Sequence, residues 1–340
     1  MLDELKIAVN DLLDERALSP DVMKSAVGSI MDGRCSDAEI AAFLTALRCR
    51  GESVGELVGA AQAMRERATP IICQTQGLLD TCGTGGDLLH TFNISTAAAL
   101  VATAAGQPVA KHGNRGATST TGSADVLEAL GVNLQLSPER VARCIDEVGI
   151  GFCFAPLLHG AMKHVAPVRK QLGFRTIFNL LGPLTNPARA TFQVIGATRN
   201  KVAEMLAHAL YELGSERVIV VCGNNELDEV SLWGETVAFE VSRHGVIRHM
   251  WNASMLGLAE CRVDALRINS AAESAEVIRR VFAGETGPAR DIVVANAAAA
   301  LLAANRVETI RAAVPMAQAA IDSGKVMGIC ERLKQWTNEE

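Results

Sequence analysis

The sequence is poor in aromatic residues and carries no excess of positive charge. Phe, Trp and Tyr make up 4% of the 340 residues, so we expect no stacking platform for the bases of a single-stranded nucleic acid. The formal net charge is −6, with both signs interspersed, so no broad cationic surface can attract a nucleic-acid backbone. We therefore expect no nucleic-acid partner, and any phosphate binding must be local.

The sequence also lacks an apolar run long enough to cross a bilayer. Its most apolar later stretch, residues 292–304, is too short and carries Asn296. Near the start, Asp3, Glu4 and Lys6 alternate with apolar residues, which excludes the uninterrupted apolar core of a secretory signal. These features predict a cytoplasmic protein that makes no membrane contact.

Cysteines are present but form no recognisable framework. The nine cysteines are scattered from Cys35 to Cys330 with no C-x-x-C pair. An odd, dispersed set fits neither a disulfide scaffold nor a zinc site. We expect buried, reduced thiols.

The length and the apolar pattern predict two packed units. A chain of 340 residues exceeds the size at which one core usually stops growing. The first 67 residues read as four amphipathic helices, with start signals at Ser19-Pro20, Ser36 and Ser53. From Thr69-Pro70 onward, short apolar runs alternate with glycine-rich turns and helices, which is typical of an α/β unit. The expected strands are 77–81, 108–111, 151–155, 192–197 and 217–222, followed by an edge or antiparallel strand at 237–241 and three Ala-rich helices between 271 and 323.

A glycine-rich loop follows the first expected strand. Residues 80–87 read DTCGTGGD, and residues 91–96, TFNIST, open an Ala-rich helix. Glycines let backbone amides approach an anion closely, and a helix N-terminus offers free N–H groups and a positive dipole end. The arrangement suits a phosphate or diphosphate, although a tight strand-to-helix turn explains the loop equally well when it is considered alone.

A second loop, residues 111–123, is crowded with hydrogen-bond donors. Lys111 and Arg115 supply cationic contacts, the hydroxyl groups between Thr118 and Ser123 supply neutral ones, and Ser123 is placed to cap the helix that follows. Two such loops indicate a ligand with more than one phosphate group. His112, taken alone, is more often structural than catalytic.

Two further segments provide carboxylates and a guanidinium. Asp228 and Glu229 follow an expected strand, where adjacent carboxylates suit hydrated Mg²⁺; a solvated acidic turn is the alternative. Because a diphosphate leaving group requires charge neutralisation, these carboxylates and the two loops explain one another. Arg169 could pair with the carboxylate of an acceptor substrate, or form an ordinary surface ion pair.

Taken together, these segments resemble the anthranilate phosphoribosyltransferases, which join anthranilate to phosphoribosyl diphosphate in tryptophan biosynthesis. The motifs G-T-G-G-D, N-I-S-T, K-H-G-N-R, V-A-P-V-R, N-L-L-G-P-L-T-N-P and L-D-E occur in that order along the chain. The resemblance implies a small all-helical domain, residues 1–70 with 165–190, used for dimerisation and on the acceptor side. It also implies a larger α/β domain, residues 71–164 with 191–340, with a central mixed sheet flanked by helices and a cleft at the hinge. A homodimer is expected.

The resemblance also implies roles for individual residues. Lys111 would stabilise the departing diphosphate, Asn114 would orient the amine, Arg169 would hold the acceptor carboxylate, and His112 or water would take the released proton. Mg²⁺ would be held by Ser95, Asp228 and Glu229, and anthranilate by Gly83, Asn114, Arg169 and Pro183. The implied donor site comprises Gly83, Gly86, Asp87, Thr91, Asn93, Ile94, Ser95, Thr96, Lys111, His112, Gly113, Asn114, Arg115, Gly116, Ala117, Thr118, Ser119 and Ser123.

The sequence departs from the family pattern mainly on the acceptor side. Gly160 follows His159 where H-P-A-M-K is common, and Leu158 stands where an aromatic residue is frequent. Two alternatives therefore stay open: an enzyme like the pyrimidine nucleoside phosphorylases, or a non-catalytic relative that binds nucleic acid. Paired magnesium carboxylates argue against the first alternative, and the negative net charge argues against the second.

Overall fold

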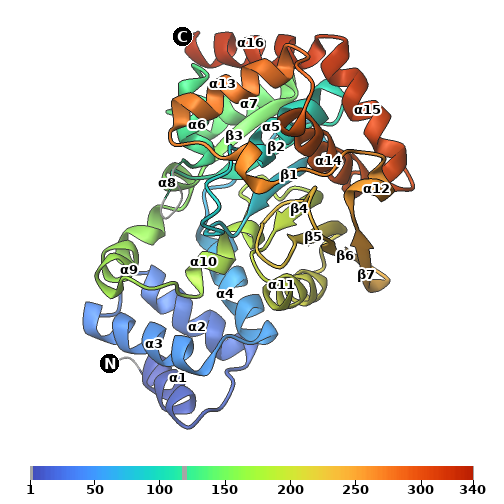
Figure 1. The fold of residues 1–340 in the computed structure, drawn as a ribbon. Helices are drawn as coiled ribbons and strands as arrows, with labels where there is room; N and C mark the ends of the chain where they lie inside the picture. The colour runs from blue at the N-terminus through green and yellow to red at the C-terminus, as the bar shows by residue number, and fades with distance from the viewer. Residues whose placement is uncertain (1–2, 117–120, 340) are drawn as a thin grey trace.

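The computed structural model describes residues 3–116 and 121–339. Its first part is a bundle of four helices, drawn in blue in Figure 1: α1 (Asp3–Leu13), α2 (Pro20–Met31), α3 (Asp37–Arg50) and α4 (Val54–Arg67). Ser19, Ser36 and Ser53 cap α2, α3 and α4 with their side chains. The start signals predicted from the sequence are therefore confirmed.

The second part is built on a seven-stranded mixed sheet in the order β3-β2-β1-β4-β5-β6-β7. Strands β1 to β5 are parallel, and β6 and β7 are antiparallel additions. The strands are β1 (Leu79–Gly83), β2 (Val109–Gly113), β3 (Ile150–Phe154), β4 (Phe192–Gly196), β5 (Arg217–Gly223), β6 (Thr236–Ser242) and β7 (Gly245–Trp251). The expected fold class, a helical domain plus an α/β domain with a mixed sheet, is confirmed.

The direction in which the chain adds strands changes at β1. From β1 the chain adds β2 and β3 on one side, and then returns to place β4 and β5 on the other side. In open α/β sheets, ligands bind at such a switch point, outside the carboxyl ends of the strands. Gly83 and Gly196, the last residues of β1 and β4, lie side by side at this point.

Helices cover both faces of the sheet (Figure 1). Helix α14 is buried along most of its length and packs against α5 and α15, so the apolar stretch 292–304 is a core helix. The helices are α5 (Ile94–Ala104), α6 (Ser123–Ala129), α7 (Pro138–Val148), α11 (Asn200–Glu212), α12 (Ala253–Leu256), α13 (Ala271–Phe282), α14 (Pro288–Ala303), α15 (Ile310–Asp322) and α16 (Lys325–Asn338), with a 3₁₀ turn at Val263–Leu266. No helix in the described ranges is long and apolar enough to cross a membrane.

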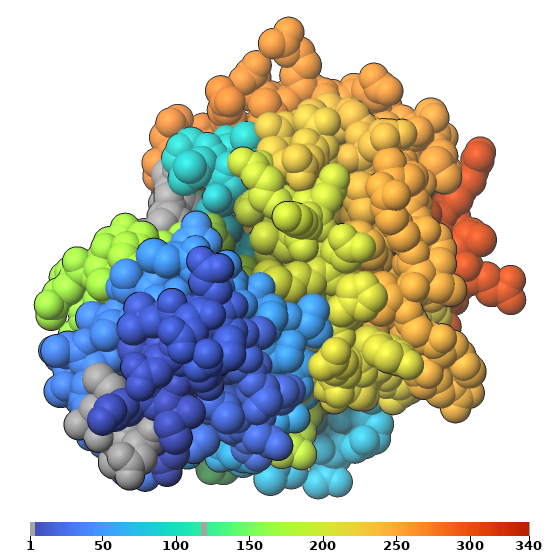
Figure 2. All heavy atoms as spheres, turned by 90° about the horizontal axis from the view of Figure 1, so that it is seen from below, coloured from blue at the N-terminus to red at the C-terminus, as the bar shows by residue number. Residues whose placement is uncertain are grey.

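The segment after β3 returns to the helical bundle. It contains α8 (Ala155–Leu158), η1 (Gly160–His164), α9 (Ala166–Leu172), α10 (Phe178–Leu181) and η2 (Gly182–Leu184). Helix α9 contacts α3, α10 contacts α4, and η1 contacts α2. One apolar cluster joins the bundle, this segment, α11 and one face of the sheet. Figure 2 shows the blue bundle seated beside the yellow-green and yellow part of the α/β domain.

The nine cysteines, all within the described residues, are free thiols. Cys144, Cys153, Cys222 and Cys330 are buried, whereas Cys49 is exposed and the others are partly exposed. The expectation of reduced thiols therefore agrees with the structure, but complete burial holds for these four alone.

Candidate active site

Asp228 lies in the crevice between β1 and β4 because two glycines leave room for it. A Cβ atom on Gly83 would lie 2.5 Å from Asp228 Oδ2, and one on Gly196 would lie 1.7 Å from the Asp228 backbone oxygen. Glycine is therefore required at both strand ends to admit the acidic turn. Gly83 was expected to contact anthranilate; in the structure its neighbour is the Asp228 carboxylate.

The acidic turn is bound to the glycine loop, to α5 and to a helix distant in sequence. Asp228 Oδ2 accepts a hydrogen bond from the Gly85 N–H (2.9 Å), and Glu229 Oε1 accepts one from the Ser95 N–H (3.0 Å). Behind them, Asn296 accepts from the Val230 N–H (2.8 Å) and donates to the Val230 carbonyl oxygen (3.1 Å). Asn296, which sequence reasoning noted only as a polar interruption, fixes the backbone that carries both carboxylates.

The carboxyl groups of Asp87, Asp228 and Glu229 are buried close to one another, which raises their pKa values. Burial, with repulsion from Asp87, raises the pKa of Asp228 to about 7. Burial, with repulsion from Asp228, raises the pKa of Glu229 well above its usual range, and burial also raises the pKa of Asp87. Burial is the largest cause of each shift, and the attraction of Glu229 to Lys111 only partly opposes it.

The donor set fits a hydrated Mg²⁺ ion. In the described ranges, no group of three His, Cys, Asp or Glu side chains is arranged to hold a metal by itself. Mg²⁺ does not require one, since it commonly takes one or two carboxylates and completes its shell with water and substrate phosphates. Asp228 and Glu229 supply hard oxygens at the carboxyl ends of the strands. The Ser95 hydroxyl oxygen is 3.4 Å from Lys111 Nζ, so it faces the same crevice.

Lys111 is buried beneath the glycine loop. Its Nζ donates to the carbonyl oxygen of Thr81 and, at 3.4 Å, to the hydroxyl of Ser95. Burial lowers the pKa of Lys111, while the nearby Asp80 opposes this shift. Asp80 is itself fully buried, and it accepts from the His112 N–H (3.0 Å) and from Asn186 Nδ2 (2.8 Å). Asp80 and Asn186 thus align β2 with the site, although sequence reasoning assigned them no role.

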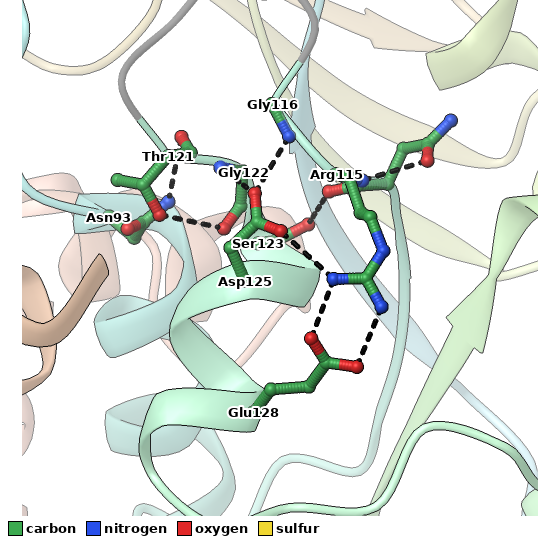
Figure 3. Close-up of polar contacts among 9 residues, drawn as sticks. Asn93, Arg115, Gly116, Thr121, Gly122, Ser123, Asp125 and Glu128 are labelled. Atoms are coloured by element: carbon green, nitrogen blue, oxygen red, sulfur yellow. Dashed lines mark hydrogen bonds and ion pairs between the residues drawn. The ribbon is translucent and has the colours of Figure 1, made fainter. Parts of the chain in front are cut away.

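The second loop closes onto its own helix through Arg115 (Figure 3). Its guanidinium donates to both carboxylate oxygens of Glu128, at 2.6 and 2.7 Å, and to Asp125 Oδ1 at 3.1 Å. These carboxylates raise the pKa of Arg115. Arg115, expected to contact a phosphate, is therefore paired with Glu128 and Asp125 of the protein itself. The expected contacts from Ala117, Thr118 and Ser119 lie outside the described residues.

Ser123 does not cap its helix, contrary to expectation. Gly122 occupies the N-cap position, and Asp125 Oδ2 accepts from the N–H groups of Gly122 (2.8 Å) and Gly116 (2.9 Å). Ser123 is the first helical residue, and its hydroxyl donates to the Asn114 carbonyl oxygen at 3.4 Å. Figure 3 shows Asp125 between the two glycines, the position in which it performs the predicted capping role.

The remaining expected donor residues line the start of α5. Asn93 is the N-cap residue, and its Oδ1 accepts from Ser274 Oγ at 2.8 Å. Thr91 forms an isolated bridge with Arg267, and Ile94 is buried in the core. Thr96 Oγ1 is buried and has no hydrogen-bond partner in the described part of the chain.

A cavity of about 420 Å³ lies beside the glycine loop. Thr84, Gly86 and Asp87 line one wall, and Arg48, Arg175 and Arg199 come from three other elements. Arg175 donates to the carbonyl oxygens of Gly85 (2.8 Å) and Thr84 (3.1 Å), so it holds the carbonyl side of the loop. Sequence reasoning assigned Arg175 no role, and only the fold shows which loop it contacts.

A second cavity, about 410 Å³, lies on the other side of His112 and Asn114. Arg169 lines it, with its guanidinium carbon 5.7 Å from the centre of the Phe178 ring and no acidic partner among the described residues. Asn114 Oδ1 accepts from the Arg115 N–H at 2.7 Å, which leaves its NH₂ group as the donor for a ligand. Gly182 lines this cavity, whereas Pro183 is buried behind it.

His112 and His159 form a hydrogen-bonded pair at this cavity. His112 Nδ1 is 3.1 Å from the Gly182 carbonyl oxygen, so Nδ1 carries the proton and Nε2 is an acceptor. His159 Nε2, 3.1 Å from His112 Nε2, must then be the donor. Burial lowers the pKa of His112 to about 4 and that of His159 to about 3, so both rings are neutral at neutral pH. His159 stood in a quoted motif, but this pairing depends on contacts distant in sequence.

The sequence matches two family descriptions that together cover most of the chain. Residues 6–68 match the helical bundle domain of a glycosyl transferase family. Residues 75–327 match the a/b domain of a glycosyl transferase family.

Curated relatives are similar over their whole length. An anthranilate phosphoribosyltransferase of Geotalea uraniireducens (strain Rf4) is 47% identical over 349 residues, covering 98% of this chain and 100% of the relative. One from Symbiobacterium thermophilum is 48% identical over 334 residues, covering 98% of both chains.

Solved structures are similar in fold as well. The crystal structure of anthranilate phosphoribosyltransferase from Thermus thermophilus has a TM-score of 0.92 at 41% identity, covering 98% of this chain and 99% of that one. The enzyme from Saccharomyces cerevisiae, in complex with phosphoribosyl diphosphate (PRPP) and Mg, has a TM-score of 0.91 at 26% identity, covering 99% and 98%. The same yeast enzyme with 4-fluoroanthranilate has a TM-score of 0.88 at 26% identity, covering 98% and 97%.

Proposed function

Because the chain belongs to the family of anthranilate phosphoribosyltransferases, we infer that it transfers the phosphoribosyl group of 5-phospho-α-D-ribose 1-diphosphate to the amine of anthranilate. The products are N-(5-phosphoribosyl)anthranilate and diphosphate, in tryptophan biosynthesis. One observation carries this inference: the acidic turn meets the glycine loop and α5 on one side of the crevice, and an unpaired arginine lines a cavity on the other. Donor and acceptor can therefore lie side by side.

On the donor side, we propose that the diphosphate lies between the glycine loop and the start of α5. The N-terminal amides of α5 and the positive end of its dipole favour an anion there. Asp228, Glu229 and Ser95 would hold Mg²⁺, which neutralises charge on the leaving diphosphate when bound. Lys111 supports Ser95 from below, which keeps the hydroxyl oxygen directed at the crevice. The yeast relative solved with PRPP and Mg supports this assignment.

On the acceptor side, we propose that Arg169 holds the carboxylate of anthranilate. Phe178 restricts the guanidinium from one face, the two histidines of the cavity are neutral, and Lys163 is a second cationic side chain in its lining. The NH₂ group of Asn114 can donate to the carboxylate or to a donor phosphate. This differs from orienting the amine directly, since a donor placed on the amine lone pair would reduce its nucleophilicity. Fixing both substrates in a shared crevice supplies much of the acceleration.

We propose that no side chain activates the amine before attack. An arylamine is uncharged at neutral pH, so its lone pair is available once the ribose bears positive charge. The released proton can pass to water or to the neutral His112–His159 pair. A low pKa in this pair fits brief acceptance of a proton from a strongly acidic arylammonium group.

We also propose that the chain forms a homodimer through its helical bundle and works in the cytoplasm. An apolar groove of about 470 Å³ between α1 and α3 is lined by Val9, Leu12, Leu13 and Ala46, and Leu13 is 69% exposed. An exposed apolar groove is favoured as a contact surface. The domain division at residues 1–70 with 165–190 belongs to the same proposal. Sedimentation of the parent and of Leu13→Arg tests it, because the substitution should shift the protein toward the monomer mass.

The experiment that tests the function compares three reactions of the purified protein. With PRPP and anthranilate, we expect diphosphate release coupled to loss of anthranilate. With phosphate and thymidine or uridine, we expect no cleavage, whereas a nucleoside phosphorylase would cleave them. With labelled DNA or RNA, we expect no mobility shift at moderate salt. Nucleoside cleavage without PRPP turnover would reverse the assignment.

A further inference from the structure

The two carboxylates of the acidic turn occupy backbone amides that face the crevice. Asp228 accepts from Gly85 N–H at 2.9 Å, in the middle of the glycine loop. Glu229 accepts from Ser95 N–H at 3.0 Å. Ser95 is the second residue of α5, so its N–H has no acceptor within the helix. These are amides that an anion bound at the loop would need.

An amide N–H carries one hydrogen and serves one close acceptor at a time. A phosphate oxygen and a carboxylate oxygen therefore compete for Gly85 N–H and for Ser95 N–H. The carboxylates also repel a diphosphate, because the charges have the same sign. With Asp228 and Glu229 in these positions, an anion at the loop finds both amides already hydrogen-bonded, and it is repelled by whichever carboxyl group is ionised.

The carboxylates can leave these amides without refolding the turn. Asn296 holds the backbone at Val230 from both its N–H and its carbonyl oxygen. Gly83 and Gly196, where a Cβ atom would collide with the turn, leave room for the Asp228 backbone and side chain against the ends of β1 and β4. The exchange then requires rotation of the two side chains and release of the hydrogen bond between Asp228 and Asp87, while the backbone of the turn stays in place.

We propose that Asp228 and Glu229 act as an internal substitute for the donor's diphosphate, and that a divalent cation draws them off the Gly85 and Ser95 amides. The diphosphate then takes their place. The inference rests on the proposed donor site and deepens it, because it couples the binding of the cation to that of the donor. By linkage, donor and cation strengthen each other's binding by the same factor.

The test measures binding of inorganic diphosphate by titration calorimetry, in chelator, to the parent and to three variants. Asp228→Ala, Asp228→Asn and Asp87→Asn each remove one carboxyl group from the crevice. Asp228→Ala alone frees the Gly85 N–H, because the side-chain amide introduced by Asp228→Asn still offers an oxygen to it. Asp87 contacts neither amide: its Oδ1 accepts from Leu89 N–H at 3.2 Å, and its side chain is hydrogen-bonded to that of Asp228. Each variant therefore lacks one carboxyl group, but only Asp228→Ala also lacks an acceptor for the Gly85 N–H.

We expect Asp228→Ala to bind metal-free diphosphate about tenfold more tightly than the parent, and the two Asn variants to gain about threefold or less. Glu229→Ala, which frees Ser95 N–H, should behave like Asp228→Ala and serves if the first variant does not fold. Equal gains in all variants would overturn the exchange, because loss of charge alone would explain them. No gain in any variant would also overturn it. If the parent fails to bind diphosphate even with Mg²⁺, the proposed donor site falls, and this inference falls with it.

Discussion

The two cavities of the crevice are similar in size, about 420 and 410 Å³, but opposite in character. Beside the glycine loop, the first cavity is lined by Asp87 and three arginines, and the buried Asp228 and Glu229 lie against the loop with raised pKa values and accept from the Gly85 and Ser95 amides. Beside Arg169, the histidines are neutral and the arginine has no acidic partner among the described residues. The first side suits a cation with a polyanion, and the second suits a planar organic acid.

The largest expected effect comes from removing charge on the donor side. Asp228→Ala should lower magnesium-dependent turnover by about 1000-fold, because the leaving diphosphate loses its neutralising partner. Initial rates of diphosphate release across a magnesium titration measure it. Glu308→Gln, an exposed acid far from the site in sequence, is the control and should match the parent. Unchanged magnesium dependence in Asp228→Ala would remove the metal assignment.

On the acceptor side, Arg169→Ala should raise the KM for anthranilate by about 100-fold, the cost of a charge-assisted hydrogen bond. The KM for PRPP should change less than about twofold. Lys170→Ala, at the exposed neighbouring position, is the matched control. If the KM values for anthranilate and PRPP rose together, Arg169 would act on both substrates, and the two cavities would not bind them separately.

A smaller effect should come from Asn296, which touches neither substrate. Asn296→Ala removes the hydrogen bonds to Val230 and should weaken Mg²⁺ binding by about tenfold, as loss of a residue that orients metal ligands does. Calorimetric titration with Mg²⁺ measures it, and the melting temperature reports the structural cost. A large fall in stability with unchanged Mg²⁺ affinity would limit Asn296 to a packing role.

An effect on stability, rather than on substrate or metal binding, concerns the neutral histidine pair. The folded pKa values, about 4 for His112 and about 3 for His159, lie below the unfolded value near 6.5. Between these values the unfolded chain binds more protons, so the pair contributes stability above pH 6.5 that is lost as the pH falls toward 4. Each ring contributes up to about 1.4 kcal/mol per pH unit, so we expect the pair to lose about 2 kcal/mol per pH unit across this window.

Urea unfolding at several pH values between 4 and 7 measures this slope. His159→Phe should flatten it, because one of the two buried titrating rings is gone. His208→Phe, at an exposed position of α11, should leave it as in the parent. If all three proteins gave the same slope, the pKa of His159 would not be lowered by burial in the folded protein.

Local signals were enough to predict much of this structure. The serine caps identified the helical bundle, and the apolar runs identified the parallel strands. The glycine loop and the Asp228-Glu229 pair, singled out for phosphate and metal binding, are in direct contact in the fold. What could not be predicted depends on contacts distant in sequence. Arg115 turns to Glu128, Gly122 displaces Ser123 at the cap, and Asn296 reaches Val230. Each depends on how the elements pack, which no short pattern records.

The most direct test of the account is the fluorescence of anthranilate mixed with the protein and PRPP, first with Mg²⁺ and then with a chelator. The account predicts rapid loss of fluorescence with Mg²⁺, matched by diphosphate release, and little loss with the chelator. Retained fluorescence with Mg²⁺, while diphosphate is released onto another aromatic amine, would contradict the acceptor assignment around Arg169. No diphosphate release with any amine would contradict the transferase assignment itself.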